Sequence, residues 1–360
     1  MTGGKDVKIS NIQLGLLLVG FFYGSTALMN PAGSAGRESW IAVILGWALG
    51  LMLIIMYVKI AQLNPGKTLI EMLRINFGNV IGSMVSALYI WYFIHLASLV
   101  TRNFGEFMTT TSYTETPMSV IVVLFVALTV YVVRSGLEVL GRVSEVVVWA
   151  IPVIIFIASA ALWTIHDFSV LIPLFEKGIK PVLSAGFALS TFPFGEAVAF
   201  MMVFPYLNKK EYMFKTAILS ATAIGFLFLV SVSRDLVILG PKLMTEINYS
   251  PDIVTKLVPG VSVEPFLDIN LLIGGGIKVS ICLYAAVKGT AELLKFENYR
   301  PLVTAFGAFF IVLSFWLYTN ALEMMTWAKD IWPYYSLPFQ YLIPAILLIT
   351  SYIRSKKSIK

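Results

Sequence analysis

Two ionisable side chains, Glu196 and Lys278, stand inside long apolar runs of this sequence and are the residues best suited to chemistry. A carboxylate inside a membrane segment is costly and by default indicates a functional site. Glu196 could anchor the ammonium group of a ligand, or take up a proton when its site is desolvated. The alternative is a structural role, as the partner of a neighbouring N–H group or of a lysine.

The chain is broken directly before Glu196. Residues 191–206 form an apolar run that Pro193 and Gly195 interrupt. Inside a bilayer every backbone N–H and C=O must be paired within the protein, so a break is tolerated only where it is buried or lines a wet cavity. We therefore predict a polar ligand at this break. The residues expected to bind it are Phe192, Pro193, Phe194, Gly195 and Glu196.

The composition indicates an integral membrane protein. Of the 360 residues, 58% are hydrophobic and 13% are charged, which is too apolar for a soluble globular protein. The net charge of +6 concerns topology and anionic lipid, so the lipid bilayer is the expected partner and nucleic acid is not. Two separated histidines and one cysteine cannot assemble a typical zinc site, and a glycine-rich phosphate loop is missing. We therefore expect no enzyme activity, no cofactor and no metal.

Ten membrane-spanning helices are expected, in a single domain of residues 1–360. Their approximate bounds are Ile9–Ala35, Trp40–Leu63, Val80–Met108, Met118–Val133, Val143–Ile165, Val182–Leu207, Tyr212–Leu236, Val263–Lys295, Leu302–Leu322 and Leu337–Ile353. An even number puts both termini on one side. With that side cytoplasmic, seventeen Lys and Arg residues face the cytoplasm and eight face outward, as the positive-inside rule requires.

The first expected span is interrupted like the sixth. Gly20, Gly24, Ser25 and Thr26 precede the sequence Asn30-Pro31-Ala32-Gly33. An interrupted helix therefore opens each half of the chain, at about residues 9–165 and 182–353. Inverted five-helix repeats have this signature, and their discontinuous first and sixth helices meet near the middle of the bilayer. At such a break the freed N–H groups attract a carboxylate, and the freed C=O groups accept hydrogen bonds from an ammonium. The pair of breaks therefore suits a zwitterion or a small polar solute.

Other residues could line the same chamber. They are Tyr23, Gly24, Ser25 and Thr26 on the first helix, and Tyr89 and Tyr92 on the third. The alternative is packing, because small residues commonly bring membrane helices together and tyrosines fill cores.

Two further groups are expected near the outer face. Glu106, Arg234 and Asp235 could form a gate, but solvated ion pairs are the default interpretation. The aromatic residues Trp327, Trp332, Tyr334 and Tyr335 are expected to form a belt at the outer membrane surface.

Four stretches carry a resemblance to a known family. They are Ile9-Ser10 with Gln13, Gly136-Leu137-Glu138 with Gly141-Arg142, Phe192-Pro193-Phe194-Gly195-Glu196, and Ile277-Lys278-Val279-Ser280 with Tyr284-Ala285-Ala286. Over about residues 9–354 the chain resembles the spore germination permease family. Its members are the B subunits of endospore germinant receptors, within the amino acid–polyamine–organocation (APC) superfamily.

The resemblance implies an all-α, ten-helix fold of the LeuT or APC type that binds a nutrient, such as an amino acid, in a central cavity. It also implies two partners, a germinant receptor A subunit and a lipoprotein C subunit, in the inner membrane of the bacterial endospore. Occupancy of the cavity is read in this family as a signal to germinate, with ion release an early consequence.

Lys278 and Ser280, on the eighth helix, are expected to act as an internal cation or in gating, because Lys278 lies 14 residues after Glu264 and 17 before Lys295, near the middle of the membrane. Lys278 could replace the sodium ion that many relatives hold between helices one and eight, or it could lock the resting state through a salt bridge to Glu196. A purely structural lysine is the third interpretation. Nearby, Gly274-Gly275-Gly276 replace the usual bulky residues, and we expect them to widen or loosen the site.

Three functions remain open from the sequence. The first is a nutrient sensor whose bound ligand shifts a conformational equilibrium that partner subunits read. The second is a proton-coupled secondary transporter that moves an amino acid through the same cavity. The third is a structural or ion-channel-forming subunit with no ligand of its own.

Overall fold

A computed structural model describes residues 8–24, 26, 29–176, 178–247, 249–258, 260 and 264–358. The described residues form helices joined by turns and loops, with one isolated parallel β-bridge between Ile9 and Leu207. Ser25, one of the residues expected to bind substrate, lies outside the described part of the chain.

The first half of the chain contains four long helices and several short ones. Its elements, with η marking 3₁₀ or π segments, are α1 (Asn11–Tyr23), η2 (Pro31–Glu38), α2 (Ser39–Leu63), α3 (Leu69–Phe77), α4 (Asn79–Thr111), α5 (Met118–Ser135), α6 (Leu137–Val147), α7 (Ala150–Ala161), η3 (Trp163–Ile165) and η4 (Phe168–Leu171).

The second half begins with the expected broken helix. Its elements are α8 (Lys180–Leu189), η5 (Ser190–Phe194), η6 (Gly195–Met202), η7 (Phe204–Tyr206), η8 (Lys210–Tyr212), α9 (Met213–Glu246), α10 (Ser250–Lys256), α11 (Glu264–Leu294), α12 (Arg300–Trp316), α13 (Ala321–Thr326), η9 (Trp327–Ile331), α14 (Trp332–Tyr335), η10 (Pro338–Leu342) and α15 (Ile343–Ser358).

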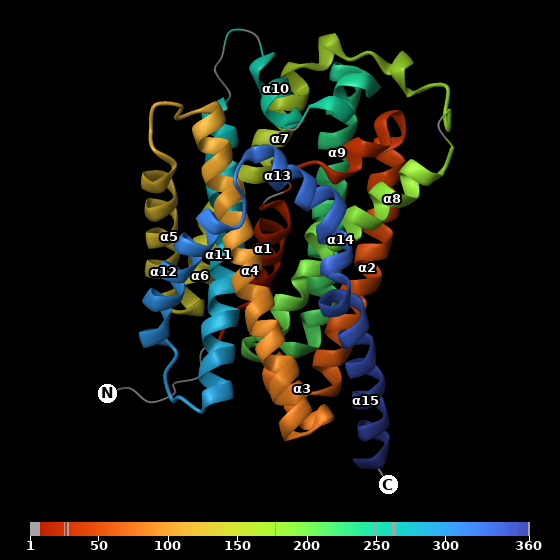
Figure 1. The fold of residues 1–360 in the computed structure, drawn as a ribbon. Helices are drawn as coiled ribbons and strands as arrows, with labels where there is room; N and C mark the ends of the chain where they lie inside the picture. The colour runs from red at the N-terminus through yellow and green to blue at the C-terminus, as the bar shows by residue number, and fades with distance from the viewer. Residues whose placement is uncertain are drawn as a thin grey trace.

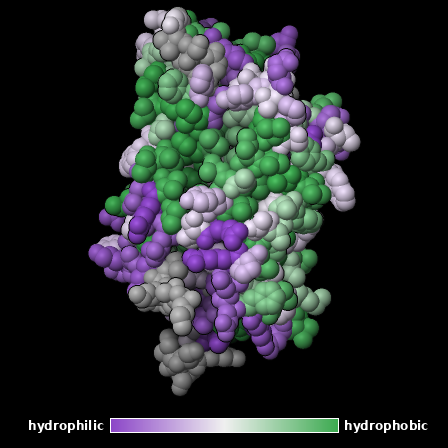
Figure 2. Space-filling view, turned by 90° about the vertical axis from the view of Figure 1, so that its left-hand side faces the viewer, coloured by the Kyte–Doolittle hydropathy of each residue, from purple (hydrophilic) through white to green (hydrophobic). Residues whose placement is uncertain are grey.

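This is a multi-pass membrane fold. Within the described ranges, eight helices are long and apolar enough to cross a bilayer. Two shorter apolar helices, α1 and α12, occupy the positions of the expected first and ninth spans. Figure 2 shows a broad hydrophobic zone on one face, with hydrophilic side chains collected below it. The division into two inverted repeats stays a prediction.

Helix α1 lies at the centre of the bundle (Figure 1). It packs against α6, α9 and α11, and Leu14, Phe21 and Phe22 are completely buried. A reciprocal pair of hydrogen bonds between Ser10 and Gln13 caps its beginning. Its apolar side chains leave no charged group to be paired inside the bundle, which is compatible with its central place.

The first helix is broken where the sequence predicts. α1 ends at Tyr23, and the N–H of Gly24 donates to the carbonyl oxygen of Gly20 at 3.0 Å. The Thr26 hydroxyl then donates to the carbonyl oxygens of Phe22 and Tyr23, at 2.8 and 2.9 Å. Thr26 therefore satisfies acceptors that the end of the helix leaves free. Regular structure resumes in η2, which continues directly into α2.

The start of α1 and the end of α15 both point toward the same end of the molecule, which we call the terminal end (Figure 1). The β-bridge joins the start of α1 to the end of the broken sixth span. The Ile9 N–H donates to the carbonyl oxygen of Tyr206 at 2.9 Å, and the Asn208 N–H to that of Ile9 at 3.0 Å. Two backbone hydrogen bonds therefore hold the two broken helices together at the terminal end.

The last span departs from the prediction. It runs from Ala321 to Lys356 as one kinked helix, so it begins well before the expected Leu337. π-helical segments mark the kinks, at η9 and η10. The outer aromatic belt is therefore wrong for Trp332, which is only 3% exposed and packs inside the bundle, while Tyr334 is 67% exposed.

Glycines let α1 and α11 approach closely. A Cβ atom on Gly274 would lie 2.8 Å from the backbone nitrogen and 2.9 Å from the Cα of Gly24. Gly275 and Gly276 instead face Phe125, with ordinary van der Waals spacing. The expectation that the glycine run widens the site is wrong at Gly274, because the backbone of α1 occupies the space that a side chain would fill.

Substituting Gly274 by Ala should therefore destabilise the chain. The added methyl meets backbone atoms that cannot rotate away, and we expect a loss of about 1–3 kcal/mol of unfolding free energy. Thermal unfolding of the purified chain in detergent measures it. Gly275→Ala is the matched control and should cause no loss, because its Cβ would lie 3.6 Å from the Phe125 ring. Equal melting temperatures for the two variants would contradict the close packing.

Candidate ligand-binding site

The break in the sixth span is built from residues 190–195. The backbone of Phe192 leaves the helical region, with φ −136° and ψ 106°, and Pro193 has no N–H to donate. The carbonyl groups around the break therefore need other partners. The side-chain nitrogen Nε2 of Gln340 donates to the carbonyl oxygen of Thr191 at 2.9 Å, and the Tyr57 hydroxyl to that of Gly195 at 2.9 Å.

Gln340 and Tyr57 connect the break to three other spans. Gln340 Nε2 also donates to the Tyr92 hydroxyl at 2.8 Å, and the Tyr57 hydroxyl also donates to the backbone carbonyl of Gln340 at 2.8 Å. A Cβ on Gly195 would collide with Gln340 Oε1, so the glycine is required by this contact. The break is therefore a rigid, hydrogen-bonded structure and not a loosely packed gap.

Tyr89 and Tyr92 have structural contacts in this region. Tyr92 stacks on Phe339, with ring centroids 4.6 Å apart, and the Tyr89 hydroxyl donates to the carbonyl oxygen of Phe339 at 2.7 Å. Both tyrosines are completely buried. The structure thus places them in the packing between α4 and the last span, which supports the break from behind.

Glu196 and Lys278 form an ion pair at the centre of the bundle. Glu196 Oε2 and Lys278 Nζ are 2.5 Å apart, and both side chains are 0% exposed. Neither carboxylate oxygen, nor the ammonium, has a hydrogen-bond partner elsewhere in the described chain. Of the possibilities for Lys278, the salt bridge to Glu196 is the contact present in this structure.

Aromatic rings and glycines surround the Lys278 ammonium. Nζ lies 4.6 Å from the ring centroid of Phe192 and 5.5 Å from that of Phe21, distances that favour cation–π attraction. A Cβ on Gly24 would lie 2.9 Å from Lys278 Cδ, so the end of α1 touches the lysine stem. The ion pair therefore joins both helix breaks to α11. Ser280, two residues further along α11, is also buried.

A small cavity reaches Glu196 from the side opposite the terminal end, which we call the far end. It is lined by Glu196, Phe192, Asn103, Met29, Tyr318 and Trp332, among others, and about 30 Å³ is open to the centres of water molecules. We call it the Glu196 cavity. A larger vestibule of about 340 Å³, measured the same way, shares Met29, Phe192 and Ala328 with it.

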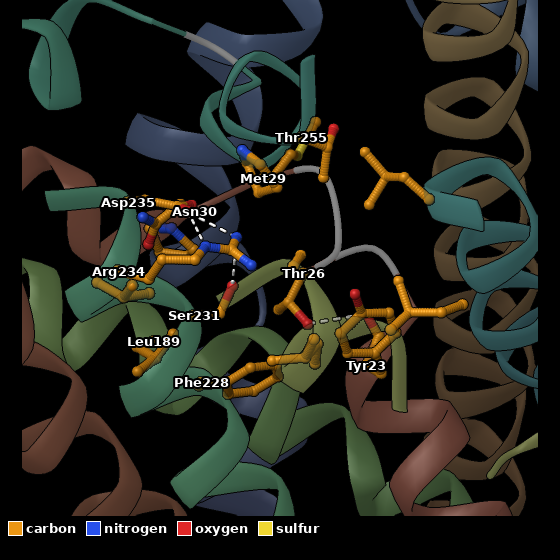
Figure 3. A pocket seen from close by; sticks show the side chains of 17 residues that line it. Tyr23, Thr26, Met29, Asn30, Leu189, Phe228, Ser231, Arg234, Asp235 and Thr255 are labelled. Atoms are coloured by element: carbon orange, nitrogen blue, oxygen red, sulfur yellow. Dashed lines mark hydrogen bonds and ion pairs between the residues drawn. The ribbon is translucent and has the colours of Figure 1, made fainter. Parts of the chain in front are cut away.

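A second small cavity lies beside the end of α1 and contains Tyr23 and Thr26 (Figure 3). We call it the Tyr23 cavity. Its other wall carries Arg234 and Asp235, whose side chains are 5% and 1% exposed. The expectation of solvated ion pairs is therefore wrong for these two residues, which α9 carries into the bundle.

The residues expected to bind a ligand thus lie in three places: two cavities and the helix break. Tyr23 and Thr26 line one cavity, and Phe192 and Glu196 line the other. Phe194 packs its ring against Phe22, with centroids 5.3 Å apart. Pro193, Phe194 and Gly195 are buried in the break itself. The described residues contain no group of three or more His, Cys, Asp or Glu side chains placed to hold a metal ion.

Sequence reasoning missed Tyr57 and Gln340. A signal was available, because a glutamine in the middle of an apolar span needs a hydrogen-bond partner inside the protein. The partner itself could not be read from the sequence, since Gln340 and Thr191 are 149 positions apart.

The fold defines a class of protein. MhsT in complex with L-phenylalanine superposes with a TM-score of 0.64, at 12% identity over 98% of this chain and 100% of that one. A Na+-coupled sialic acid symporter, solved substrate-bound and outward-open, gives 0.69 at 10% identity, over 98% and 90%. The fold is that of the LeuT-type transporters, as expected from the two broken helices.

The sequence comparison is more specific than the fold. Residues 8–322 match the family model described as spore germination protein. Spore germination protein KB of Bacillus subtilis (strain 168) is 33% identical over 98% of this chain and 97% of that protein. The chain belongs to the spore germination protein family, and the resemblance carried by the four motifs is confirmed.

Removing the Tyr57 hydroxyl should weaken the break strongly. Tyr57→Phe removes the one hydroxyl proton that the carbonyl oxygens of Gly195 and Gln340 share, and a buried polar group left unpaired costs about 1–3 kcal/mol. Tyr89→Phe is the matched control, since it removes the same atom but frees only the carbonyl of Phe339. Thermal unfolding should show the larger loss for Tyr57→Phe. A larger loss for Tyr89→Phe would contradict the support assigned to Tyr57.

Proposed function

We propose that this chain is the nutrient-sensing membrane subunit of a spore germination receptor. The observation that carries the proposal is the buried Glu196–Lys278 ion pair, placed where the two broken helices meet. Family membership and the LeuT-type fold support the setting. The pair holds the broken helices to α11 in the resting state, and binding of a small polar nutrient separates the two side chains.

Charge balance favours an amino acid as the nutrient. A buried ion pair that loses one partner leaves an uncompensated charge, at a cost of about 3–5 kcal/mol. A zwitterion avoids this cost, because its ammonium replaces Lys278 at Glu196 while its carboxylate pairs with Lys278. An amine or a carboxylate alone would leave one buried charge unpaired. A sugar or nucleoside, being uncharged, offers no ionic replacement for either partner.

The nutrient enters from the far end. The vestibule meets the Glu196 cavity at Met29 and Phe192. At the terminal end the Ile9–Leu207 bridge joins the broken helices. Separating Lys278 from Glu196 changes the contact between α11 and both breaks, and the ligand shifts the conformational equilibrium by its difference in affinity for the two states.

The receptor setting follows from the family. The chain acts beside an A subunit and a lipoprotein C subunit, in the inner membrane of the endospore. Both termini are cytoplasmic, in agreement with the excess of Lys and Arg on that side. The vestibule therefore faces away from the cytoplasm. A secondary transporter that couples amino acid movement to protons is the second candidate, because the solved structures with this fold include a symporter.

Ligand-induced stabilisation of the purified chain tests the nutrient class. L-alanine and glycine should raise the melting temperature, since a ligand present at 100 times its Kd stabilises by about 2.7 kcal/mol. Propionate, ethylamine, glucose and a nucleoside, at the same concentrations, should not. Stabilisation by a sugar or nucleoside, with none by amino acids, would overturn the charge-balance argument, and no stabilisation by any compound would favour a structural or channel-forming subunit.

The ion pair itself is tested by a double-mutant cycle. Lys278→Met leaves the Glu196 carboxylate buried alone and should cost about 3–5 kcal/mol of unfolding free energy. The Glu196→Gln/Lys278→Met variant should recover most of that loss, because no buried charge is then unpaired, yet its stabilisation by L-alanine should fall. Additive losses in the cycle would show that the two side chains are uncoupled.

Counterflow in proteoliposomes separates the sensor from the transporter. A sensor binds labelled L-alanine without accumulating it. Robust accumulation by this chain alone, dependent on a proton gradient, would replace the sensor with the transporter.

A further inference from the structure

Arg234 and Asp235 form a second buried ion pair, beside the break in the first helix. Arg234 Nε and Nη2 donate to Asp235 Oδ1, at 2.9 and 2.6 Å. Both residues belong to α9, within a membrane-spanning helix. Charged residues in such helices are rare and face the bundle interior or a cavity, where they mark functional sites.

The pair leaves hydrogen-bonding groups unused. Arg234 Nη2 also donates to Ser231 Oγ, and Asp235 Oδ2 accepts from Ser250 Oγ, but both distances are 3.4 Å, which is long for a hydrogen bond. The side-chain nitrogen of Asn30 is buried and also lacks a partner in this part of the chain. Arg234, Asp235 and Asn30 line the same cavity, the Tyr23 cavity. The cavity therefore has on its wall one donor without a partner, on Asn30, and two groups held only by long hydrogen bonds, on Arg234 and Asp235.

The cavity limits what can bind. About 40 Å³ is open to the centres of water molecules, which corresponds to about three or four waters. Figure 3 shows Arg234, Asp235 and Asn30 on one side of this space and Tyr23 with Thr26 on the other. The remaining lining includes the apolar Phe228. A ligand must be small, with a polar head and little apolar bulk.

We infer that the Tyr23 cavity is a second binding site, for a small zwitterionic amino acid the size of glycine or alanine. The ligand carboxylate accepts hydrogen bonds from Arg234 and Asn30, and its ammonium donates to Asp235. The ion pair and the ligand are each neutral overall, so the occupied site carries no net charge. A lone carboxylate or a lone amine would bring an unbalanced charge into the membrane interior.

This site is separate from the one at Glu196. The two cavities share Met29, and each adjoins the vestibule: the Tyr23 cavity at Met29, Asn30 and Pro31, the Glu196 cavity at Met29, Phe192 and Ala328. Neither ion pair lines the other's cavity. The second site therefore stands or falls independently of the proposed function of Glu196.

Binding stoichiometry of the purified chain provides the test. Equilibrium binding of radiolabelled glycine and L-alanine should give two sites per chain, with propionate and ethylamine failing to compete. Ser231→Leu should remove one site, or weaken it by about tenfold or more, because leucine fills the cavity and removes the hydroxyl that accepts from Arg234 Nη2. Ser233→Leu is the matched control: it makes the same change two residues along α9, outside the lining, and should keep both sites.

A variant without the charges of the Arg234–Asp235 pair gives a second measurement of the number of sites. The Arg234→Gln/Asp235→Asn variant removes both charges together, so no buried charge is left unpaired, and it should also lose one site. If gel filtration shows that Ser231→Leu does not fold, the Arg234→Gln/Asp235→Asn variant tests the second site in its place. Glu196→Gln should remove the other site and leave this one.

The outcomes separate the two proposals. Unchanged binding in Ser231→Leu and in the Arg234→Gln/Asp235→Asn variant would overturn the second site. A single binding site that Glu196→Gln abolishes would also overturn it, and would leave the proposed function standing. Binding confined to the Tyr23 cavity would support this inference and remove Glu196 from ligand recognition. No binding of either amino acid to the unmodified chain would overturn both.

Discussion

A charge can persist in the middle of a membrane only when another charge or a dipole compensates for it, and this structure is organised around that constraint. Glu196 and Lys278 come from different spans, yet their side chains meet directly, with Oε2 and Nζ 2.5 Å apart. The cation–π contacts of Lys278 with Phe21 and Phe192 fix its ammonium from the sides. The pair links η6 to α11, and the lysine stem touches the end of α1, so one interaction connects both broken helices to α11.

The helix breaks exist because neighbouring spans supply the hydrogen bonds that the breaks lose. Tyr57 and Gln340 pair with the carbonyl groups of Gly195 and Thr191, and Thr26 pairs with those at the end of α1. Without such partners, unpaired backbone groups would destabilise a break in hydrocarbon by several kcal/mol. The glycines at 24, 195 and 274 complete the arrangement by letting backbone and side chains approach where a Cβ would collide. The breaks are thus rigid features that place charged groups, rather than flexible joints.

The molecule is asymmetric along the membrane normal. At the terminal end two backbone hydrogen bonds join the broken helices, and at the far end a vestibule adjoins two small cavities. One cavity has Glu196 on its wall, and the other has both Arg234 and Asp235. The same fold serves many ligands, so the residues at these cavities, and not the fold, must decide what this chain binds.

The sequence by itself determined the membrane class, the helical fold, the two breaks and the family. These follow from local properties: the transfer of apolar runs into lipid, the loss of a backbone donor at Pro193, and short motifs such as the one ending at Glu196. Only the tertiary structure decided which groups meet. The partner of Lys278, the burial of Arg234 and Asp235, the inward position of Trp332, and the support from Tyr57 and Gln340 all depend on how each helix is rotated and how closely neighbours pack. Periodicity cannot reveal these in spans that are apolar on every side. The glycine run shows the same limit. From the sequence, the missing side chains predicted open space in the site, whereas in the bundle the backbone of α1 occupies that space at Gly274.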